Sequence, residues 1–224
     1  MRCSILGPLL YVLYLNDLSS VSEACFSILF ADDTNMFITG NDVNCMCDKL
    51  NSDLARIQEW LYCNKLSLNV SKTHYMIFTP RNKNIEDVDV RIQNICIDRV
   101  FVSKFLGVQI DSKLSWKNHT DYICSKLSKC VGILAKARKK MYKSALINLY
   151  YSFAYPYLMY CNHVWGENYQ SNLEKVVLVQ KKLIRIITCS PYLAHTEPLF
   201  AANNILTVND ITQYVIGIFL YMIT

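Results

Sequence analysis

Residues 27–38 read SILFADDTNMFI, in which two apolar runs enclose the polar residues 32–35. Each apolar run is typical of a buried strand, and a polar break between two such runs predicts a β-hairpin with Asp32 and Asp33 at its tip. Paired carboxylates at a rigid turn are hard oxygen ligands that bind Mg²⁺ together with water and substrate phosphate. The alternative interpretation is that the two aspartates only form a surface turn, which is the commoner role of such a pair.

The composition indicates a folded protein. The 224 residues are 52% hydrophobic and 18% charged, enough to bury a core in one large domain or two small ones. No apolar segment reaches the roughly 18 residues of a membrane-spanning helix, and residues 214–223 come nearest. The ten cysteines form no Cys-x-x-Cys pair and no signal peptide precedes them, so we expect reduced, mostly buried thiols without disulfides or a zinc site. A soluble intracellular protein is expected, nuclear or cytoplasmic and not secreted.

Basic residues concentrate in residues 104–143. This segment holds ten lysines and arginines against two aspartates, Asp111 and Asp121, a local balance of +8 within a chain of net charge +5. A partner built of phosphates suits such a segment. The alternative is a solvated helix face that binds nothing.

The first part of the chain predicts two helices. Pro8 begins an apolar segment that ends near Asn16, and because nearly every side of this helix is apolar we expect it to be buried. Asp42 is placed to cap an amphipathic helix over residues 43–61, whose apolar side is expected to cover a sheet.

Short strands are expected after this helix. Residues 75–79 form an apolar run that Pro80 ends, with Lys72 in the loop before it. Further runs predict strands at residues 88–92, 95–97, 100–102 and 105–110. The last of these carries Gly107 in its interior, where another backbone can come close.

Beyond Trp116 the apolar period changes from two residues to about 3.6, which predicts helices over residues 120–141, 144–153 and 173–187. Thr196 is expected to cap a further short helix and Asp210 a last apolar one. The aromatic side chains near Pro156 are able to stack on bases, but an aromatic cluster in a helical domain is more often core.

Five groups of residues follow one another in order. They are Ser4-Ile5-Leu6-Gly7-Pro8-Leu9-Leu10 with Leu15-Asn16-Asp17-Leu18; Phe30-Ala31-Asp32-Asp33; Trp60 with Asn64-Lys65-Leu66, Asn69 and Lys72-Thr73; Lys104-Phe105-Leu106-Gly107-Val108 with Asp111, Leu114-Ser115-Trp116 and His119; and Pro156, Tyr160, Val164-Trp165-Gly166, Gln180-Lys181-Lys182, Arg185-Ile186-Ile187 and His195-Thr196-Glu197-Pro198-Leu199-Phe200. In this order and spacing they closely resemble the reverse transcriptases of non-LTR (LINE-type, jockey-like) retrotransposons. The resemblance covers nearly the whole chain.

The resemblance implies an α+β fold. Residues 1–116 would form the rear half of a polymerase palm, an antiparallel sheet with covering helices, and residues 117–224 an all-helical thumb-like domain. The implied activity is that of an RNA-directed DNA polymerase, which transfers a nucleotide to a primer 3′-hydroxyl with two Mg²⁺ ions. The implied partners are an RNA template, a DNA primer and dNTPs, and no membrane.

Three residues take catalytic roles by this resemblance. Asp32 would bind the catalytic Mg²⁺, with Asp33 as the supporting metal ligand of the same hairpin. Lys72 matches a lysine thought to donate a proton to the pyrophosphate leaving group, as a mobile cation beside that group is able to do. The alternative is that Lys72 is an ordinary surface lysine.

The resemblance also implies a nucleic-acid surface. Ala31 lies in the palm hairpin, and Phe105, Leu106 and Gly107 resemble the primer grip, a glycine-containing hairpin that lets backbone approach nucleic acid. The basic helices that follow would hold the duplex through its phosphates, which predicts salt-sensitive and largely sequence-independent binding. The candidate phosphate-binding residues are Lys126, Lys129, Lys136, Arg138, Lys139 and Lys140.

The chain departs from the family pattern at its start. The family requires a further aspartate on a strand well upstream of Ser4, which this chain lacks, and Arg2-Cys3 stand where a Gln-Gly pair is usual. We therefore expect an N-terminally truncated fragment with an incomplete two-metal site, inactive alone. Two alternatives are a non-catalytic nucleic-acid-binding module and a helical protein-interaction domain.

Overall fold

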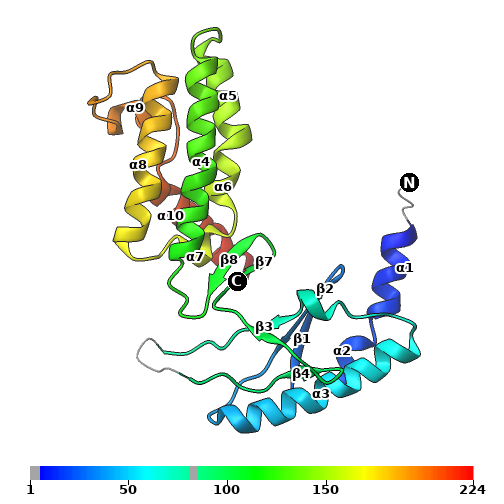
Figure 1. Ribbon diagram of the computed structural model, residues 1–224. Helices are drawn as coiled ribbons and strands as arrows, with labels where there is room; N and C mark the ends of the chain where they lie inside the picture. The colour runs from blue at the N-terminus through cyan, green and yellow to red at the C-terminus, as the bar shows by residue number, and fades with distance from the viewer. Residues whose placement is uncertain (1–5, 81–84, 224) are drawn as a thin grey trace. The chain divides into compact units, whose positions relative to one another are not determined.

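The computed structural model of the chain describes residues 6–80 and 85–223 (Figure 1). These residues form helices and small sheets, so the expected α+β class is confirmed. The chain divides into two compact units, Met1–Phe101, here the N-terminal unit, and Val102–Thr224, here the helical unit. This division precedes the domain boundary predicted after residue 116, because the hairpin that opens the helical unit packs with the helices after it.

The N-terminal unit contains helices α1 (Leu6–Leu15), α2 (Leu18–Val21) and α3 (Val43–Cys63) and the 3₁₀ turn η1 (Val70–Lys72). α3 begins where the sequence predicts, because the Asp42 carboxylate accepts a hydrogen bond of 3.1 Å from the Asn44 amide of the first turn. This N-cap prediction is therefore confirmed.

The strands of the N-terminal unit pair two by two. β1 (Phe26–Phe30) is antiparallel to β2 (Asp33–Phe37), β3 (His74–Tyr75) is parallel to β6 (Asp98–Arg99), and β4 (Arg91–Ile92) is antiparallel to β5 (Ile95–Cys96). The strands expected at residues 75–79, 88–92 and 95–97 are thus shorter than predicted. Each sheet formed by the described residues has only two strands.

A small core joins α3 to β4. Val90, Ile92 and Ile97 are buried there, and the partly buried Leu50 and Leu54 of α3 pack against them. The apolar side of α3 therefore covers strands, as its amphipathic pattern predicts.

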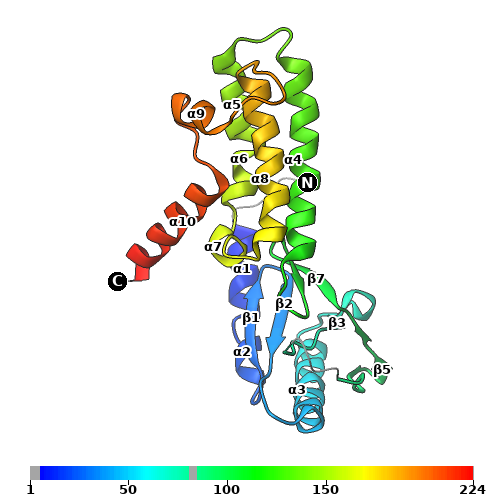
Figure 2. The same cartoon turned by 90° about the vertical axis from the view of Figure 1, so that its left-hand side faces the viewer.

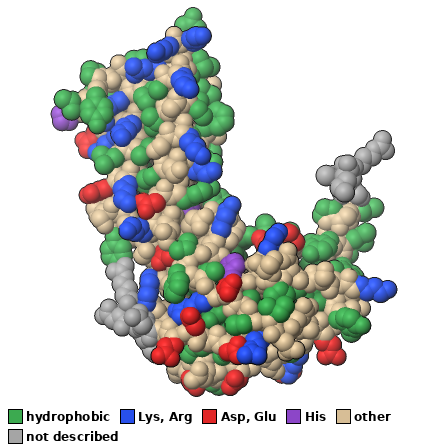
Figure 3. Space-filling model, viewed as in Figure 1, with side chains coloured by type: hydrophobic (Ala, Val, Ile, Leu, Met, Phe, Trp, Pro, Cys, Tyr) green, Lys and Arg blue, Asp and Glu red, His purple; other side chains and the backbone are tan. Residues whose placement is uncertain are grey.

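Two expectations of burial are wrong. In α1 only Leu15 is buried, while Leu9 and Leu10 are 58% and 60% exposed. Figure 3 shows hydrophobic side chains on the surface of the molecule. In the β1–β2 hairpin Phe26 and Phe30 are 68% and 59% exposed. An apolar sequence becomes buried only where another surface covers it, and the described residues do not cover these two faces.

The helical unit opens with the hairpin β7 (Val102–Phe105) and β8 (Val108–Asp111). The helices that follow are α4 (Lys117–Ala137), α5 (Lys143–Phe153), α6 (Tyr155–Met159), α7 (Asn162–Trp165), α8 (Gln170–Ile187), α9 (Glu197–Ala202) and α10 (Val208–Ile223). α4 and α8 lie side by side and run in the same direction, as Figures 1 and 2 both show. The three long helices expected here are confirmed.

The core of the helical unit lies between α4, α5, α8 and α10. It includes Ile123, Leu127, Leu134, Leu146, Leu158, Trp165, Val176, Leu183, Ile184, Ile187 and Ile211. Gln180 of α8 is 1% exposed and joins three of these helices. Its amide nitrogen donates to the Tyr150 hydroxyl at 3.0 Å and to the Leu206 carbonyl at 2.9 Å, and its amide oxygen accepts from the Val208 amide at 3.0 Å. The buried polar group is therefore fully used, as burial requires.

Two details of the predicted helices differ. Thr196 precedes α9 but its side chain makes no capping hydrogen bond, so that cap is wrong. Thr207, not Asp210, precedes α10. The Asp210 carboxylate accepts from the Thr207 amide at 3.0 Å and the Asp210 amide donates to the Thr207 hydroxyl at 3.3 Å, which makes a reciprocal capping box.

The cysteine and aromatic expectations hold in part. The nine described cysteines are all free, but only Cys25 and Cys130 are buried, so the expectation of mostly buried thiols is wrong. Of the aromatic side chains near Pro156, Tyr150 is fully buried, whereas Tyr160 is 51% exposed.

None of the described helices has both the length and the apolar character that crossing a membrane requires.

Candidate functional site

The hairpin tip at Asp32 and Asp33 forms as the sequence predicts. Phe30 pairs with Asp33 as the last rung of the β1–β2 ladder, which leaves Ala31 and Asp32 as a two-residue turn. Ala31 adopts φ +53°, a left-handed conformation that non-glycine residues rarely take and that suits the twist of a tight hairpin. Both aspartates are exposed. The two residues therefore follow one another at the end of paired strands, and both side chains are open to a ligand.

The surroundings of the two carboxylates differ. Side chains of directly paired residues lie on the same face of a sheet, so Asp33 shares a face with Phe30. Phe26 and Ile28 lie on this face too, because side chains alternate along a strand. Asp33 thus borders an exposed apolar face, whereas Asp32 occupies the turn itself.

A buried carboxylate on α3 fixes the loop that leads into β1. Asp53 is 2% exposed and accepts hydrogen bonds from the Ser22 hydroxyl at 2.6 Å, from the amides of Ala24 and Cys25 at 2.9 Å each, and from the Glu23 amide at 3.2 Å. Burial alone would raise the pKa of this carboxyl, but the hydrogen bonds together hold it well below its usual range. The anionic Asp53 therefore orders residues 22–25, directly before the hairpin strand.

Sequence reasoning missed Asp53, although a signal was present. Asp53 follows Leu50 by three residues and precedes Ile57 by four, so it lies on the apolar side of α3. A lone carboxylate on that side needs hydrogen-bond donors from another element.

Lys72 ends the 3₁₀ turn η1 and is exposed. The turn is closed by the Lys72 amide, which donates to the Asn69 carbonyl at 3.1 Å, and the next strand, β3, begins at His74. The prediction that Lys72 stands just before a strand is confirmed. Among the described residues no ion pair links Lys72 to Asp32 or Asp33.

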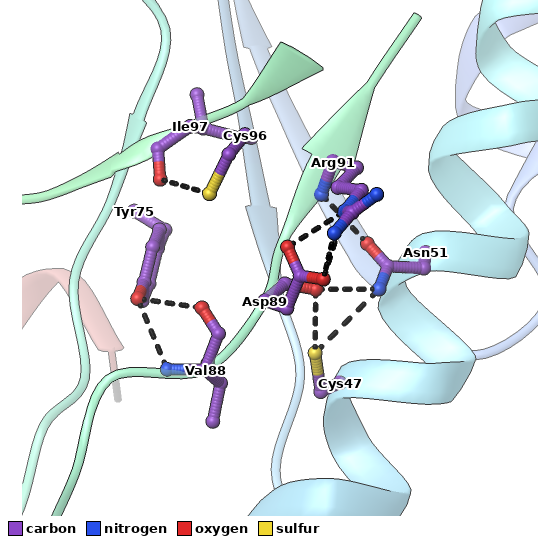
Figure 4. A network of polar contacts seen from close by, with 8 residues as sticks. All are labelled: Cys47, Asn51, Tyr75, Val88, Asp89, Arg91, Cys96 and Ile97. Carbon is purple, nitrogen blue, oxygen red and sulfur yellow. Dashed lines mark hydrogen bonds and ion pairs between the residues drawn. The ribbon is translucent and has the colours of Figure 1, made fainter. Parts of the chain in front are cut away.

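Polar contacts connect α3, β3 and residues 88–91 of the N-terminal unit (Figure 4). The Tyr75 hydroxyl donates to the Val88 carbonyl at 2.9 Å. Asn51 of α3 donates to the Asp89 carbonyl at 2.9 Å and accepts from the Arg91 amide at 3.0 Å. Because these bonds join α3, β3 and the strand at Arg91, the network serves as a scaffold for this unit.

Asp32 and Asp33 match the ligand type and number that a single Mg²⁺ ion takes from a protein. Mg²⁺ takes one or two protein carboxylates and completes its shell with water and phosphate oxygens. Asp32 and Asp33 supply two such groups, and no cluster of three or more His, Cys, Asp or Glu side chains suited to a metal occurs in residues 6–80 and 85–223. The pair is therefore able to hold an ion jointly with a phosphate-bearing substrate.

The segment that resembles the primer grip is a hairpin. Leu106 and Gly107 form its two-residue turn with φ +44° and +90°, the combination that suits a right-twisted hairpin. The expectation of one strand over residues 105–110 is therefore wrong, because Gly107 stands in the turn. The Tyr160 hydroxyl donates to the Leu106 carbonyl at 2.5 Å, and a Cβ on Gly107 would lie 3.3 Å from the Tyr160 ring. The φ of +90° favours glycine at this position, and an added Cβ would also crowd the ring.

Asp111, the last residue of the hairpin, and His119 of α4 have structural roles. The Asp111 carboxylate accepts from the amides of Lys113, Ser115 and Trp116 at 2.9 to 3.1 Å, which closes the turn into α4. His119 is 3% exposed, and its Nδ1 accepts from the Gln109 amide at 3.2 Å. Burial lowers the pKa of His119 to about 4, so the ring is neutral and ties β8 to α4.

The predicted phosphate-binding residues all lie on α4 and the loop after it. Lys129, Lys136, Arg138, Lys139 and Lys140 are exposed. Lys126 is partly buried, and its ammonium lies 5.2 Å from the centre of the Tyr122 ring. Five of the six cations are therefore fully available to solvent or a ligand.

The two hairpins and η1 all lie in a segment that matches a known family. A family model described as reverse transcriptase (RNA-dependent DNA polymerase) matches residues 4–117, just over half of the 224 residues. The chain belongs to the reverse transcriptase family. Residues 1–5, which include the start of the first motif and the departure at Arg2-Cys3, lie outside the described residues.

Curated relatives extend the similarity over the helical unit. "Probable RNA-directed DNA polymerase from transposon X-element" of Drosophila melanogaster is 26% identical over 214 residues, 92% of this chain and 23% of that protein. "RNA-directed DNA polymerase from mobile element jockey" is 25% identical in Drosophila melanogaster and 26% in Drosophila funebris, each over 88% of this chain and 22% of the relative. The chain thus spans about a quarter of the length of these relatives. No solved structure matches it.

Proposed function

We propose that this chain is part of the RNA-directed DNA polymerase of a jockey-like non-LTR retrotransposon. The observation that carries the proposal is the β1–β2 hairpin, which places Asp32 and Asp33 side by side at an exposed, rigid turn within the segment that matches the reverse transcriptase family. The N-terminal unit then belongs to the palm, and α4 to α10 belong to the thumb and the region after it. Such a protein works inside the cell, in the nucleus or cytoplasm.

In this proposal Asp32 and Asp33 bind Mg²⁺ and through it the triphosphate of a nucleotide. Ions held there would supply electrostatic stabilisation, by favouring ionisation of the primer 3′-hydroxyl and offsetting the charge of the pyrophosphate. Asp32 would contribute its carboxylate from the turn and Asp33 from the first position of β2. The role of the hairpin is to fix both carboxylates before substrate arrives.

Lys72 is proposed as the acid that protonates pyrophosphate as it leaves. An exposed ammonium at the end of a short 3₁₀ turn is free to approach a bound phosphate group. General acid catalysis of this kind contributes about 10²- to 10⁴-fold to a rate.

Two carboxylates are too few for a complete two-metal site, because the ions share bridging ligands. The described residues hold no third carboxylate beside Asp32 and Asp33. We propose that the missing group comes from the longer protein of which this chain corresponds to about a quarter, and that this chain alone extends no primer.

The β7–β8 hairpin and the lysines of α4 are proposed to hold the primer and template. Gly107 keeps the Leu106–Gly107 turn free of side-chain bulk, and five exposed cations on one helix and its following loop match a phosphate backbone. Binding of this kind weakens as salt rises and shows little sequence preference.

Primer extension tests the catalytic proposal. The complete polymerase that contains this segment is incubated with an RNA template, a DNA primer, dNTPs and Mg²⁺, beside the 224-residue chain alone. We expect extension only by the complete protein, its loss in Asp32→Asn, and a decrease of about 10²-fold or more in Lys72→Ala. The matched control is Asp48→Asn, an exposed aspartate of α3, which should retain activity. Extension that persists in Asp32→Asn would contradict the proposal.

A second candidate is a nucleic-acid-binding module without catalysis, which the exposed cations of α4 support. Under that alternative, binding of an RNA–DNA duplex survives Asp32→Ala and does not depend on Mg²⁺, and the complete protein extends no primer.

A further inference from the structure

One end of the helical unit presents an exposed aromatic ring among cations. Tyr142 lies between α4 and α5 and is 87% exposed. Its backbone is nevertheless fixed, because the Met141 amide donates to the Ala137 carbonyl at 3.0 Å and the Leu146 amide donates to the Tyr142 carbonyl at 3.1 Å. An aromatic ring held out in water by an ordered turn is available to contact a partner.

The charge around Tyr142 has one sign. Residues 136–143 contain five basic side chains and no acidic one. All five are exposed, and none forms an ion pair within the described part of the chain. The five are Lys136, Arg138, Lys139, Lys140 and Lys143. Their potentials add because they are close along the chain, so this loop attracts anions.

A second exposed ring lies at the same end of the unit. α4 and α8 run side by side in one direction, so the α4–α5 loop and the α8–α9 loop both lie where these helices end (Figures 1 and 2). Tyr192 of the α8–α9 loop is 74% exposed. The Arg185 guanidinium lies 5.9 Å from the centre of the Tyr192 ring, and its Nε donates to the Ala194 carbonyl at 3.1 Å. Arg185 therefore steadies the loop that carries this ring.

We propose that this end of the helical unit, here called the aromatic tip, binds unpaired nucleotides. The tip comprises Tyr142, Tyr192 and the five cations of residues 136–143. Tyr142 stacks on a base while the cations neutralise the neighbouring phosphates, which is how proteins bind single strands without reading sequence. The inference deepens the proposed function, since it assigns the tip to a single-stranded part of the template or primer.

The combination of groups favours a single strand over other anionic partners. A duplex hides the faces of its bases, so the exposed ring of Tyr142 would gain nothing from it, whereas each unpaired base offers a face. A membrane surface favours a continuous apolar helix face, but residues 136–143 expose only Met141 and Tyr142 as large apolar side chains among five cations.

Fluorescence anisotropy of the full 224-residue chain tests the inference, with a labelled single-stranded oligonucleotide and a duplex of the same length as probes. Tyr142→Ala should weaken binding of the single strand by about 5- to 150-fold, the range for one base stack, and leave duplex binding unchanged. Tyr142→Phe should restore single-strand binding, because stacking needs the ring and not the hydroxyl. The matched control is Tyr62→Ala, which removes a ring that is 84% exposed on α3.

Two further measurements separate stacking from charge. The fluorescence of a 2-aminopurine base in the single strand should be quenched when the wild-type chain binds, and should not be quenched by the Tyr142→Ala variant. The double variant Lys139→Gln and Lys140→Gln should reduce the slope of log K against log salt by about 1.4 for single strands, since each phosphate contact contributes about 0.7.

The inference is overturned if Tyr142→Ala leaves single-strand affinity unchanged, or if it weakens single strand and duplex equally. It is also overturned if Tyr142 matters only for binding to phosphatidylserine vesicles. Circular dichroism of each variant shows whether the fold is retained. If stacking depends on Tyr142 but the complete polymerase extends no primer, the proposed catalysis is refuted and this inference stands. Extension that requires Asp32, without stacking at Tyr142, would refute this inference alone.

Discussion

Replacing Asp53 by Asn should destabilise the loop of residues 22–25 that leads into the β1–β2 hairpin. The two side chains have nearly the same size, so packing is retained. The carboxylate Oδ2 accepts from Ser22, Ala24 and Cys25. An Asn side chain keeps one oxygen for these three donors but loses the charge, and a hydrogen bond to a charged group is worth about 1 kcal/mol more than a neutral one. The three bonds together give a loss of about 3 kcal/mol.

Hydrogen exchange of the Ala24 and Cys25 amides measures this loss locally. A decrease of about 3 kcal/mol corresponds to roughly 100-fold faster exchange, since about 1.4 kcal/mol is a factor of ten. The control is Asp48→Asn on the same helix, which is exposed and should change exchange little. If Asp53→Asn speeds exchange by less than about threefold, or no more than the control does, Asp53 does not hold this loop.

The pH dependence of Asp53 follows from its pKa. The folded pKa lies below the unfolded value of about 3.9, so the stability from the ionised carboxylate is fully present above that value. It is lost as the pH falls below about 4 towards the folded pKa. In the wild type, protection of the Ala24 and Cys25 amides from hydrogen exchange should therefore decrease as the pH falls below about 4. In Asp53→Asn this decrease should be smaller.

Two other predictions concern the helical unit. His119 has a folded pKa of about 4 against 6.5 unfolded, so the unfolded state binds more protons between these values and stability falls by about 3 kcal/mol as the pH drops across the window. His119→Asn keeps an acceptor for the Gln109 amide and should lack this pH dependence. The free energy of unfolding is measured in urea by tryptophan fluorescence, in a Trp60→Phe background. A pH profile unchanged by His119→Asn would refute the assignment. Gly107→Ala should cost about 1–2 kcal/mol because of its φ of +90° and the Tyr160 ring 3.3 Å from the added carbon. The same unfolding measurement checks it, and a neutral effect would contradict the tight packing described.

The elements predicted well are those that local chemistry decides. The helix over residues 43–61 and its Asp42 cap could be predicted because the period and the cap are local signals, and α3 agrees with both. The β1–β2 hairpin could be predicted because the polar break at Asp32 and Asp33 marks its turn. The turn at Leu106 and Gly107 has no polar break, so the continuous apolar run predicted one strand there. Only the family resemblance indicated a hairpin.

Burial was less predictable because it depends on distant partners. The apolar sequence of α1 predicts an interior helix, yet Leu9 and Leu10 are exposed, since covering them requires a surface that the helix's own sequence does not specify. In the candidate site the positions of Asp32, Asp33 and Lys72 could be predicted from pattern and resemblance. Asp53 was missed because its donors lie about 30 residues earlier in the chain.

The attachment of the β7–β8 hairpin has a mechanical consequence. The Tyr160 hydroxyl holds its turn at Leu106, and His119 Nδ1 holds its second strand at Gln109. The hairpin is therefore hydrogen-bonded to the helical part of the unit at two points, its turn and its second strand. A displacement of α4 or of the residues around Tyr160 would therefore also move the Leu106–Gly107 turn.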